Sequence, residues 1–195
     1  MKNNDQNQVI KLVSGYPRSG TSLMMQMLEA GGVPVLFDDA KEPNIHNPRG
    51  YYELKAALRL GAKDQEKDWV KNARGKAVKV MAYHLRHLPD DHTYKVIFMK
   101  RKIAEVLVSW EKMKLTKKVL TLSPEEQVMA FKTEYAVYEA RLLNNSRMDT
   151  LFVHYNDLMQ NPADEISKIA EFLSCPLDER AMLGAIEPEL YRNRC

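Results

Sequence analysis

Hydrophobic residues in this chain fall into short runs that alternate with longer stretches of helical spacing. Each run is rich in Val, Ile, Leu, Phe or Tyr and is bounded by polar or turn-forming residues. The runs are Val9–Val13, Val33–Phe37, Ala77–Tyr83, Tyr94–Met99 and Thr150–Tyr155. Nearly continuous apolar runs of this length are typical of strands that are buried on both faces, as in a parallel sheet. The pattern therefore predicts these five segments as strands.

The longer stretches carry apolar residues at spacings of three and four, which predicts amphipathic helices. They run from near Gly20 to Gly31-Gly32, from Ala104 to about Lys118, from Pro124 to about Leu143 and from 162 to 173. Ser123 is an expected N-cap, and the proline after it suits the first helical position. Strands that alternate with helices predict an α/β fold, a three-layer sandwich around a central, mostly parallel sheet.

Composition narrows the class of protein. With 195 residues, 45% of them hydrophobic, the chain is long enough for one compact unit with a sizeable core. A net charge of +3 gives no reason to expect nucleic acid as a partner. The first eight residues are polar, which predicts a disordered N-terminal segment over 1–8, and no apolar run is long enough to cross a membrane. Cys175 and Cys195 lack a metal or disulfide spacing, so we expect a cytoplasmic protein.

A candidate phosphate-binding loop lies between the first strand and the first helix. The segment from Gly15 to Ser22 reads GYPRSGTS, and a strand-to-helix turn is where backbone N–H groups and a helix N-terminus converge on a phosphate. Its glycine spacing is that of a nucleoside-triphosphate P-loop. Thr21, however, stands where that motif requires a lysine to reach the outer phosphates.

The same loop resembles the 5′-phosphosulfate loop of sulfotransferases, which has a proline, a basic residue, Ser-Gly-Thr and a hydroxyl in this order. The resemblance implies 3′-phosphoadenosine 5′-phosphosulfate as the sulfate donor and a fold of P-loop-nucleotide-hydrolase type. It also implies that Arg18 neutralises charge on the oxygen that links phosphate to the departing sulfuryl group. The donor-binding residues of this loop are expected to be Arg18, Ser19, Gly20, Thr21 and Ser22.

A second motif is similar to the 3′-phosphate site of the same family. Arg101 ends a predicted strand and Ser109 follows eight residues later in the next helix. Relatives often have Asn-Pro where this chain has Lys102-Ile103. The resemblance further places Tyr155 against the adenine. The Arg-Lys-Gly run near the C-terminus of many cytosolic sulfotransferases is absent here, and Arg192 or Arg194 are candidates to replace it.

Three residues are candidates for the base that accepts a proton from the acceptor. The segment from Lys79 to Pro89 resembles the family segment in which a strand ends in a His-Leu pair, and His84 falls on the catalytic histidine's place. Histidine titrates near neutral pH, as a general base requires. His87 is an alternative register. Glu53 is a rival, since some relatives use a carboxylate and carry an Asn-Pro-basic-Gly-aromatic segment like the one starting at Asn47.

The resemblance thus implies a single sulfotransferase-like domain over 9–195 that transfers a sulfuryl group to a hydroxyl or amine without a metal. Its partners would be the nucleotide donor, with 3′,5′-bisphosphoadenosine as product, and a small-molecule or carbohydrate acceptor bound by the region from Asp38 to Asp68. A strand that ends in Arg101, not in an acidic residue, argues against a magnesium-dependent NTPase. A P-loop kinase or nucleoside triphosphatase with an altered loop, and a non-catalytic nucleotide-binding module, are the alternatives.

Overall fold

Four parallel strands form the centre of the protein in the computed structural model, which describes residues 9–38, 44, 47–63, 67–113 and 122–191. They are β1 (Ile10–Gly15), β2 (Ala77–Lys79), β3 (Tyr94–Lys100) and β4 (Met148–His154), in the sheet order β2-β1-β3-β4. All three pairings are parallel. The predicted α/β class with a central parallel sheet is therefore confirmed. Residues 1–8 lie outside the described residues.

The prediction of a strand over Val33–Phe37 is wrong. Within this segment Val35 forms only an isolated parallel bridge to Ala77, supported by hydrogen bonds from Ala77 N to the Pro34 carbonyl and from Leu36 N to the Ala77 carbonyl. Pro34 has no N–H to donate to a longer ladder. The segment therefore runs beside the sheet edge without extending the sheet.

The predicted strand Ala77–Tyr83 is correct only for its first three residues. After β2 the chain forms a 3₁₀ helix, η1 (Ala82–His87). Ala82, Leu85 and Leu88 are buried at intervals of three residues. That interval matches the three residues per turn of a 3₁₀ helix, in which side chains at i and i+3 lie above one another. The apolar residues after Lys79 thus reflect a buried helical face and not a longer strand.

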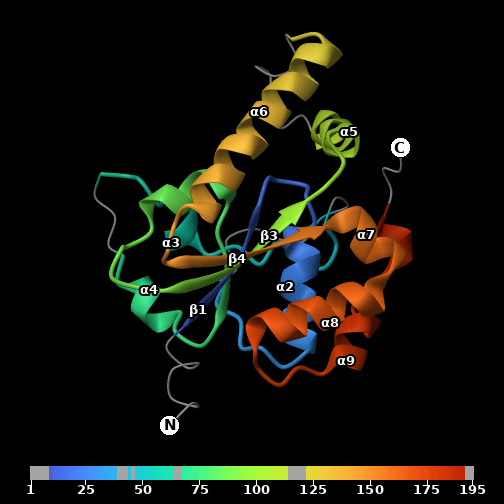
Figure 1. The fold of residues 1–195 in the computed structure, drawn as a ribbon. Coiled ribbons are helices and arrows are strands. Elements are labelled where there is room, and N and C mark those ends of the chain that lie inside the picture. Colours follow the sequence, from blue (N-terminus) through green and yellow to red (C-terminus); the bar gives the residue numbers. More distant parts are fainter. Residues whose placement is uncertain (1–8, 39–43, 45–46, 64–66, 114–121, 192–195) are drawn as a thin grey trace.

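Helices cover both faces of the sheet (Figure 1). On one face α2 (Thr21–Ala30), α8 (Pro162–Leu173) and α9 (Glu179–Gly184) contribute to a core that includes Met24, Ile97 and Ile169. On the other face α5 (Ile103–Met113) and α6 (Pro124–Leu143) join a core that includes Phe98 and Val106. The remaining short helices are α3 (Lys55–Leu58), α4 (Trp69–Asn72), α7 (Tyr155–Gln160) and η3 (Pro188–Leu190). The three-layer arrangement agrees with the prediction from the sequence.

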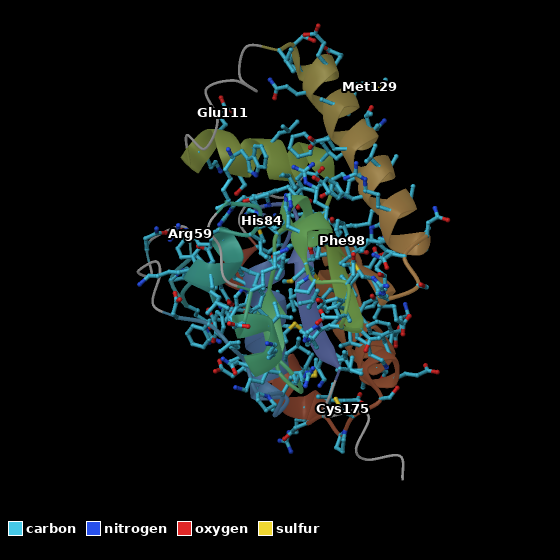
Figure 2. All side chains as sticks on the ribbon, turned by 90° about the vertical axis from the view of Figure 1, so that its left-hand side faces the viewer. Arg59, His84, Phe98, Glu111, Met129 and Cys175 are labelled. Atoms are coloured by element: carbon cyan, nitrogen blue, oxygen red, sulfur yellow. The ribbon has the colours of Figure 1, made fainter. Side chains whose placement is uncertain are left out.

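The predicted helix boundaries agree with the structure where the chain is described. Ser123 caps α6 through a capping box: its hydroxyl accepts from the Glu126 N–H while the Glu126 carboxylate accepts from the Ser123 N–H. Helix α6 ends at Leu143, as expected. Its outer end is exposed, and Met129 projects there while Phe98 lies inside the protein (Figure 2). The predicted extension of α5 toward Lys118 lies outside the described residues.

The sheet directs four chain segments to one edge. Because the strands are parallel, the residues that follow β1, β2, β3 and β4 all leave the sheet at its carboxyl end. These segments contain the Gly15–Ser22 loop, Lys79, Arg101 and Tyr155. Ligands of open α/β sheets bind at this edge, so the fold brings the separate sequence motifs to one place.

Candidate active site

Two glycines allow the loop after β1 to pass close to its neighbours. Gly20 has a φ of +99°, and a Cβ there would lie 2.5 Å from Cδ2 of Tyr155. Gly15 has a φ of +142°, and a Cβ there would lie 2.6 Å from the Met99 carbonyl oxygen. Side chains rarely adopt such φ values, and contacts this short force the neighbours to move. Glycine is required at both positions by conformation and by space.

Side-chain donors from within the loop and from other segments hold its carbonyl groups. The Ser19 hydroxyl donates to the Tyr16 carbonyl at 2.7 Å, the Trp110 indole to the Pro17 carbonyl at 2.9 Å and Arg101 Nη1 to the Arg18 carbonyl at 3.2 Å. Helix α2 follows directly, and its N-cap Gly20 supplies no side-chain cap. The first N–H groups of a helix have no partner within it, so this N-terminus is suited to an anion.

Arg18 joins the two sequence motifs. Its backbone lies in the left-handed region with a φ of 74°, which is uncommon for a residue with a side chain and indicates a conformation imposed by the surrounding contacts. Its Nε donates to the Ser109 hydroxyl over 2.8 Å. Ser109 is buried in α5, with 2% of its surface exposed. The loop after β1 and the motif after β3 are therefore in direct contact.

A buried carboxylate fixes Arg101. Glu105, with no exposed surface, accepts from Arg101 Nε at 2.7 Å, from the Tyr191 hydroxyl at 2.7 Å and from Asn156 Nδ2 at 2.8 Å. Burial alone would raise the pKa of Glu105, but these hydrogen bonds and the Arg101 charge outweigh it and lower the pKa. Glu105 is therefore a carboxylate that sets the position of the guanidinium.

Two tyrosines flank the Arg101 guanidinium. Its central carbon lies 4.4 Å from the centre of the Tyr155 ring and 5.4 Å from that of Tyr191. The two rings meet edge to face with 5.3 Å between their centres. Burial raises the pKa of Tyr155, so it stays a neutral phenol. Arg101 is thus held both by its ion pair and by cation–π contacts.

These groups line a cavity of about 140 Å³, here called the loop cavity. It contains residues from the phosphate loop, from the end of β3 and from the C-terminal segment. Its principal polar lining consists of Arg18, Gly20, Thr21, Ser22, Gln26, Asn47, Arg101, Tyr155 and Glu187. Six of the eight predicted donor-binding residues, Arg18 included, thus line this cavity. Ser19 and Ser109 do not line it, because Ser19 bonds within the loop and Ser109 bonds to Arg18.

A second cavity of about 170 Å³, here called the Lys79 cavity, adjoins the first. Arg18, Thr21, Ser22 and Asn47 line both. The rest of its lining comes from the phosphate loop, from α3 and the loop before it, and from the end of β2 and the segment after it. Those residues are Pro17, Tyr51, Glu53, Leu58, Lys79, Met81 and Tyr83. The cleft therefore has two chambers that meet at the phosphate loop.

Lys79 brings a buried ammonium group to the boundary between the chambers. Its side chain is 3% exposed and pairs with Glu53, Nζ to Oε1, at 3.3 Å, while the Glu53 side chain is 17% exposed. The same Nζ lies 3.4 Å from the Ser22 hydroxyl and donates to the Tyr51 carbonyl. A lysine from β2 thus reaches the phosphate loop in which Thr21 occupies the usual lysine position.

Comparison with known proteins identifies the family. A family model described as "Sulfotransferase domain" matches residues 10–188. This chain is a sulfotransferase. The predicted family and transferase class are confirmed. No curated protein sequence matches the chain.

Solved structures of sulfotransferases share the fold of this chain. The sulfotransferase domain of the Synechococcus olefin synthase is 18% identical, with a TM-score of 0.54 over 93% of this chain and 78% of that one. The sulfotransferase domain from the curacin biosynthetic pathway is 16% identical, with a TM-score of 0.50 over 92% and 78% of the two chains. A sulfotransferase from Mycobacterium tuberculosis is 15% identical, with a TM-score of 0.50 over 97% and 78%. The predicted P-loop-like fold of the sulfotransferase is confirmed.

Within this sulfotransferase the three candidate bases occupy different places. Glu53 lines the Lys79 cavity, whereas His84 and His87 are absent from the described lining of both chambers. The His84 ring packs against Tyr83 with 4.4 Å between centres. Burial lowers the pKa of His84, partly opposed by hydrogen bonding to the backbone of Leu60. The geometry brings Glu53, and neither histidine, to the phosphate loop.

Sequence analysis did not single out Lys79 and Asn47, which line the cleft, or Glu105, which holds Arg101. A lysine inside the buried run Ala-Val-Lys-Val was a usable signal, because a charge in a buried strand needs a specific partner. Glu105 stands four residues after Arg101 on a helix, a spacing that allows an ion pair. Asn47, whose Nδ2 donates to the Ser22 hydroxyl at 3.0 Å, gave no comparable signal.

The described parts of the chain contain neither a metal-binding cluster nor a helix that could span a membrane. Residues 9–38, 44, 47–63, 67–113 and 122–191 contain no group of three or more His, Cys, Asp or Glu side chains arranged to hold a metal ion. Among the helices of those same residues, none is both long and apolar enough to span a membrane. Arg192 and Arg194, the candidates for completing a phosphate site, lie outside the described residues.

Proposed function

We propose that this sulfotransferase takes a sulfuryl group from 3′-phosphoadenosine 5′-phosphosulfate and transfers it in line to a hydroxyl or amine of an acceptor. The observation that supports this most is the contact between the two anion-binding motifs. Arg18 of the loop bonds to Ser109, and Arg101 bonds to the Arg18 carbonyl. A single nucleotide with phosphates at both ends is the ligand that would use both motifs.

The donor would lie across the loop cavity. Its 5′-phosphosulfate would receive hydrogen bonds from the amide groups at the start of α2 and from Thr21 and Ser22, which line that cavity. Its 3′-phosphate would bind Arg101, whose guanidinium is held by Glu105. Ser109 would join Arg101 by turning its hydroxyl from Arg18 toward the phosphate. Tyr155 offers an aromatic edge for the adenine.

Transfer breaks the bond between sulfur and the oxygen that bridges to the 5′-phosphate, and forms a bond between sulfur and the acceptor atom. Negative charge develops on the bridging oxygen as it leaves. Arg18 and Lys79 border the chamber where this occurs, and fixed cations stabilise such charge best in a site with little water. The products are 3′,5′-bisphosphoadenosine and the sulfated acceptor, and the step needs no metal.

Glu53 is the base that the geometry supports best. It lines the Lys79 cavity, where an acceptor would approach the sulfuryl group from the side opposite the phosphate. Its pairing with Lys79 fixes the carboxylate next to the loop. His84 and His87 are the remaining candidates. Tyr51, Leu58 and Tyr83 give the chamber an aromatic and apolar wall, and we propose a small-molecule or carbohydrate acceptor there.

Two further inferences concern the domain organisation and the cellular location of the protein. We infer one domain over 9–195, because the sheet and both helical layers share a continuous core on each face. We also infer a cytoplasmic location, which the free thiol of Cys175 supports because reducing compartments preserve free thiols.

A transfer assay tests the proposed function. The protein is incubated with donor that is radiolabelled in its sulfuryl group and with a panel of phenols, aliphatic alcohols, sugars and amines. We expect label to appear on at least one acceptor class without added magnesium, and to be lost when Glu53 is replaced by Gln. The proposal would be overturned if the protein transferred no sulfuryl group from the sulfated nucleotide and instead transferred a phosphoryl group from ATP in the presence of magnesium.

A further inference from the structure

A large cavity outside the cleft lies between η1, the end of α6 and the start of β4. It has a volume of about 490 Å³ and is here called the arginine cavity. Met148, the first residue of β4, lines it, whereas the cleft lies beyond the last residues of the strands. Its floor is apolar and buried, formed by Ala82, Leu85, Leu142 and Met148. None of the residues of the loop cavity or the Lys79 cavity takes part in it.

Three arginines form the charged part of this lining. Arg86 comes from η1, Arg141 from the last turn of α6 and Arg147 from the turn before β4, and all three are exposed. The described residues that line the cavity include no Asp or Glu. Three positive charges from three segments therefore surround one apolar floor.

The partners of Arg147 and Arg86 compensate little of the charge of these two residues. Arg147 pairs with Asp90 at 3.2 Å, but the Asp90 side chain is 87% exposed, and such a pair contributes little to stability. Arg86 Nε donates to the imidazole of His87 at 3.0 Å, which is not an acid. The guanidinium groups can turn toward a bound anion without breaking a buried contact.

We propose that the arginine cavity binds an amphipathic small-molecule anion, with an apolar body and one carboxylate or sulfate group. The volume falls within the range of about 300–1,000 Å³ that small-molecule sites occupy. The floor suits an alkyl or aryl body, and guanidinium groups bind carboxylate and sulfate oxygens through paired hydrogen bonds. A concave apolar floor distinguishes the site from the flat basic surface that a polyanion would use.

The helix η1 connects this cavity to the cleft. Tyr83 of η1 lines the Lys79 cavity, while Ala82, Leu85 and Arg86 of the same helix line the arginine cavity. A bound anion that moves η1 would change the wall of the proposed acceptor chamber. This consequence rests on the proposed function, whereas binding in the arginine cavity does not.

Calorimetric titration with four probes tests the proposal. Octyl sulfate and octanoate, both below their micelle concentrations, carry an apolar chain and one anionic group; 1-octanol lacks the charge, and inorganic sulfate lacks the chain. We expect one or both amphipathic anions to bind at least about tenfold more tightly than octanol, which cannot form the charge-assisted hydrogen bonds. We expect a similar margin over inorganic sulfate, which has no apolar chain to bury. Comparison of the two anions distinguishes a sulfate ester from a carboxylate.

Variants locate the binding. Arg141→Gln with Arg147→Gln should weaken binding by about tenfold or more, whereas the matched pair Arg74→Gln with Arg180→Gln, also exposed but outside the cavity, should change it less than about twofold. Ser146→Trp, at the cavity mouth, should also block it. Thermal unfolding checks that each variant is folded.

Several results would overturn the proposal. Equal binding of octanol would reduce the site to an apolar hollow, and equal binding of inorganic sulfate would reduce it to a charged surface. If the two double substitutions weakened octyl sulfate binding equally, the loss would reflect the net charge of the protein and not this cavity. Tighter binding of a phosphopeptide or a DNA duplex, in competition with octyl sulfate, would assign the arginines to a macromolecule instead. If octyl sulfate bound but the transfer assay detected no sulfuryl transfer, only the proposed function would be refuted.

Discussion

The two chambers of the cleft are built in different ways. The loop cavity depends on two continuous sequence motifs, 15–22 and 101–109, and many of its fixed contacts involve backbone carbonyl groups of the loop. The Lys79 cavity combines side chains from the loop before α3, from β2 and from the start of η1. Contacts to the loop backbone contribute more to the first chamber, and side chains from several segments contribute more to the second.

This difference explains where specificity can change. A chamber made by backbone amides and a helix N-terminus recognises phosphate or sulfate whatever the acceptor is. A chamber lined by Tyr51, Leu58, Met81 and Tyr83 can change its shape through single substitutions without disturbing the loop. Substitutions at Arg18 and Glu53 test the chemical role proposed for each chamber, and substitutions at Glu105 and Gly20 test what holds the loop cavity in place.

Replacing Arg18 by Ala should have the largest effect. Loss of a positioned arginine at a transferring group costs about 10³- to 10⁵-fold in turnover in phosphoryl transfer, and sulfuryl transfer places similar demands on the leaving oxygen. We expect a fall of this size in kcat, measured with radiolabelled donor. Arg18→Lys, which retains the charge, should recover much of it. If the Ala and Lys variants were equally active, the charge at position 18 would have no role in the transfer, and the role proposed for the loop cavity would be wrong.

Replacing Glu53 by Gln should lower kcat by about 10²- to 10⁴-fold, the usual contribution of a general base. Binding of the donor should change little, because Glu53 lines only the Lys79 cavity. His84→Gln is the matched comparison and should retain activity within about threefold. If His84→Gln proved the more damaging change, the base would be assigned to the histidine.

Replacing Glu105 by Gln should destabilise the fold by about 3 kcal/mol, because it leaves the buried Arg101 guanidinium without its carboxylate. The pKa of Glu105 is lowered in the folded state, so this stabilisation is present above the unfolded pKa and is lost as pH falls through the folded one. Denaturant unfolding at neutral and acidic pH should therefore show that the variant's deficit shrinks in acid. A deficit that is constant with pH would contradict this account.

Gly20→Ala and Gly32→Ala form a matched pair with a smaller expected effect. Both residues have positive φ, which costs a side chain about 1–2 kcal/mol. A Cβ at Gly20 also meets Tyr155, whereas a Cβ at Gly32 meets no atom within 4 Å. Thermal unfolding should show the greater loss for Gly20→Ala. Equal losses would mean that Tyr155 moves aside at no cost.

The sequence predicted the lining of the loop cavity better than that of the Lys79 cavity. Local signals such as the capping box at Ser123 and the glycines of the loop act over a few residues, so pattern alone predicted α6 and the strand-loop-helix unit. The contact among Ser22, Glu53 and Lys79 joins three distant segments, and its formation depends on the path of the intervening loops. The strand predicted at Val33–Phe37 failed because Pro34 limits pairing to a single bridge.

Calorimetric titration of 3′,5′-bisphosphoadenosine and of adenosine 5′-monophosphate in magnesium-free buffer tests the central claim most directly. If Arg101 and Ser109 bind a second phosphate of the same nucleotide, the bisphosphate should bind about 10- to 100-fold more tightly than the monophosphate, as expected for one or two charge-assisted hydrogen bonds. Equal affinities, or no binding of the bisphosphate, would contradict the account.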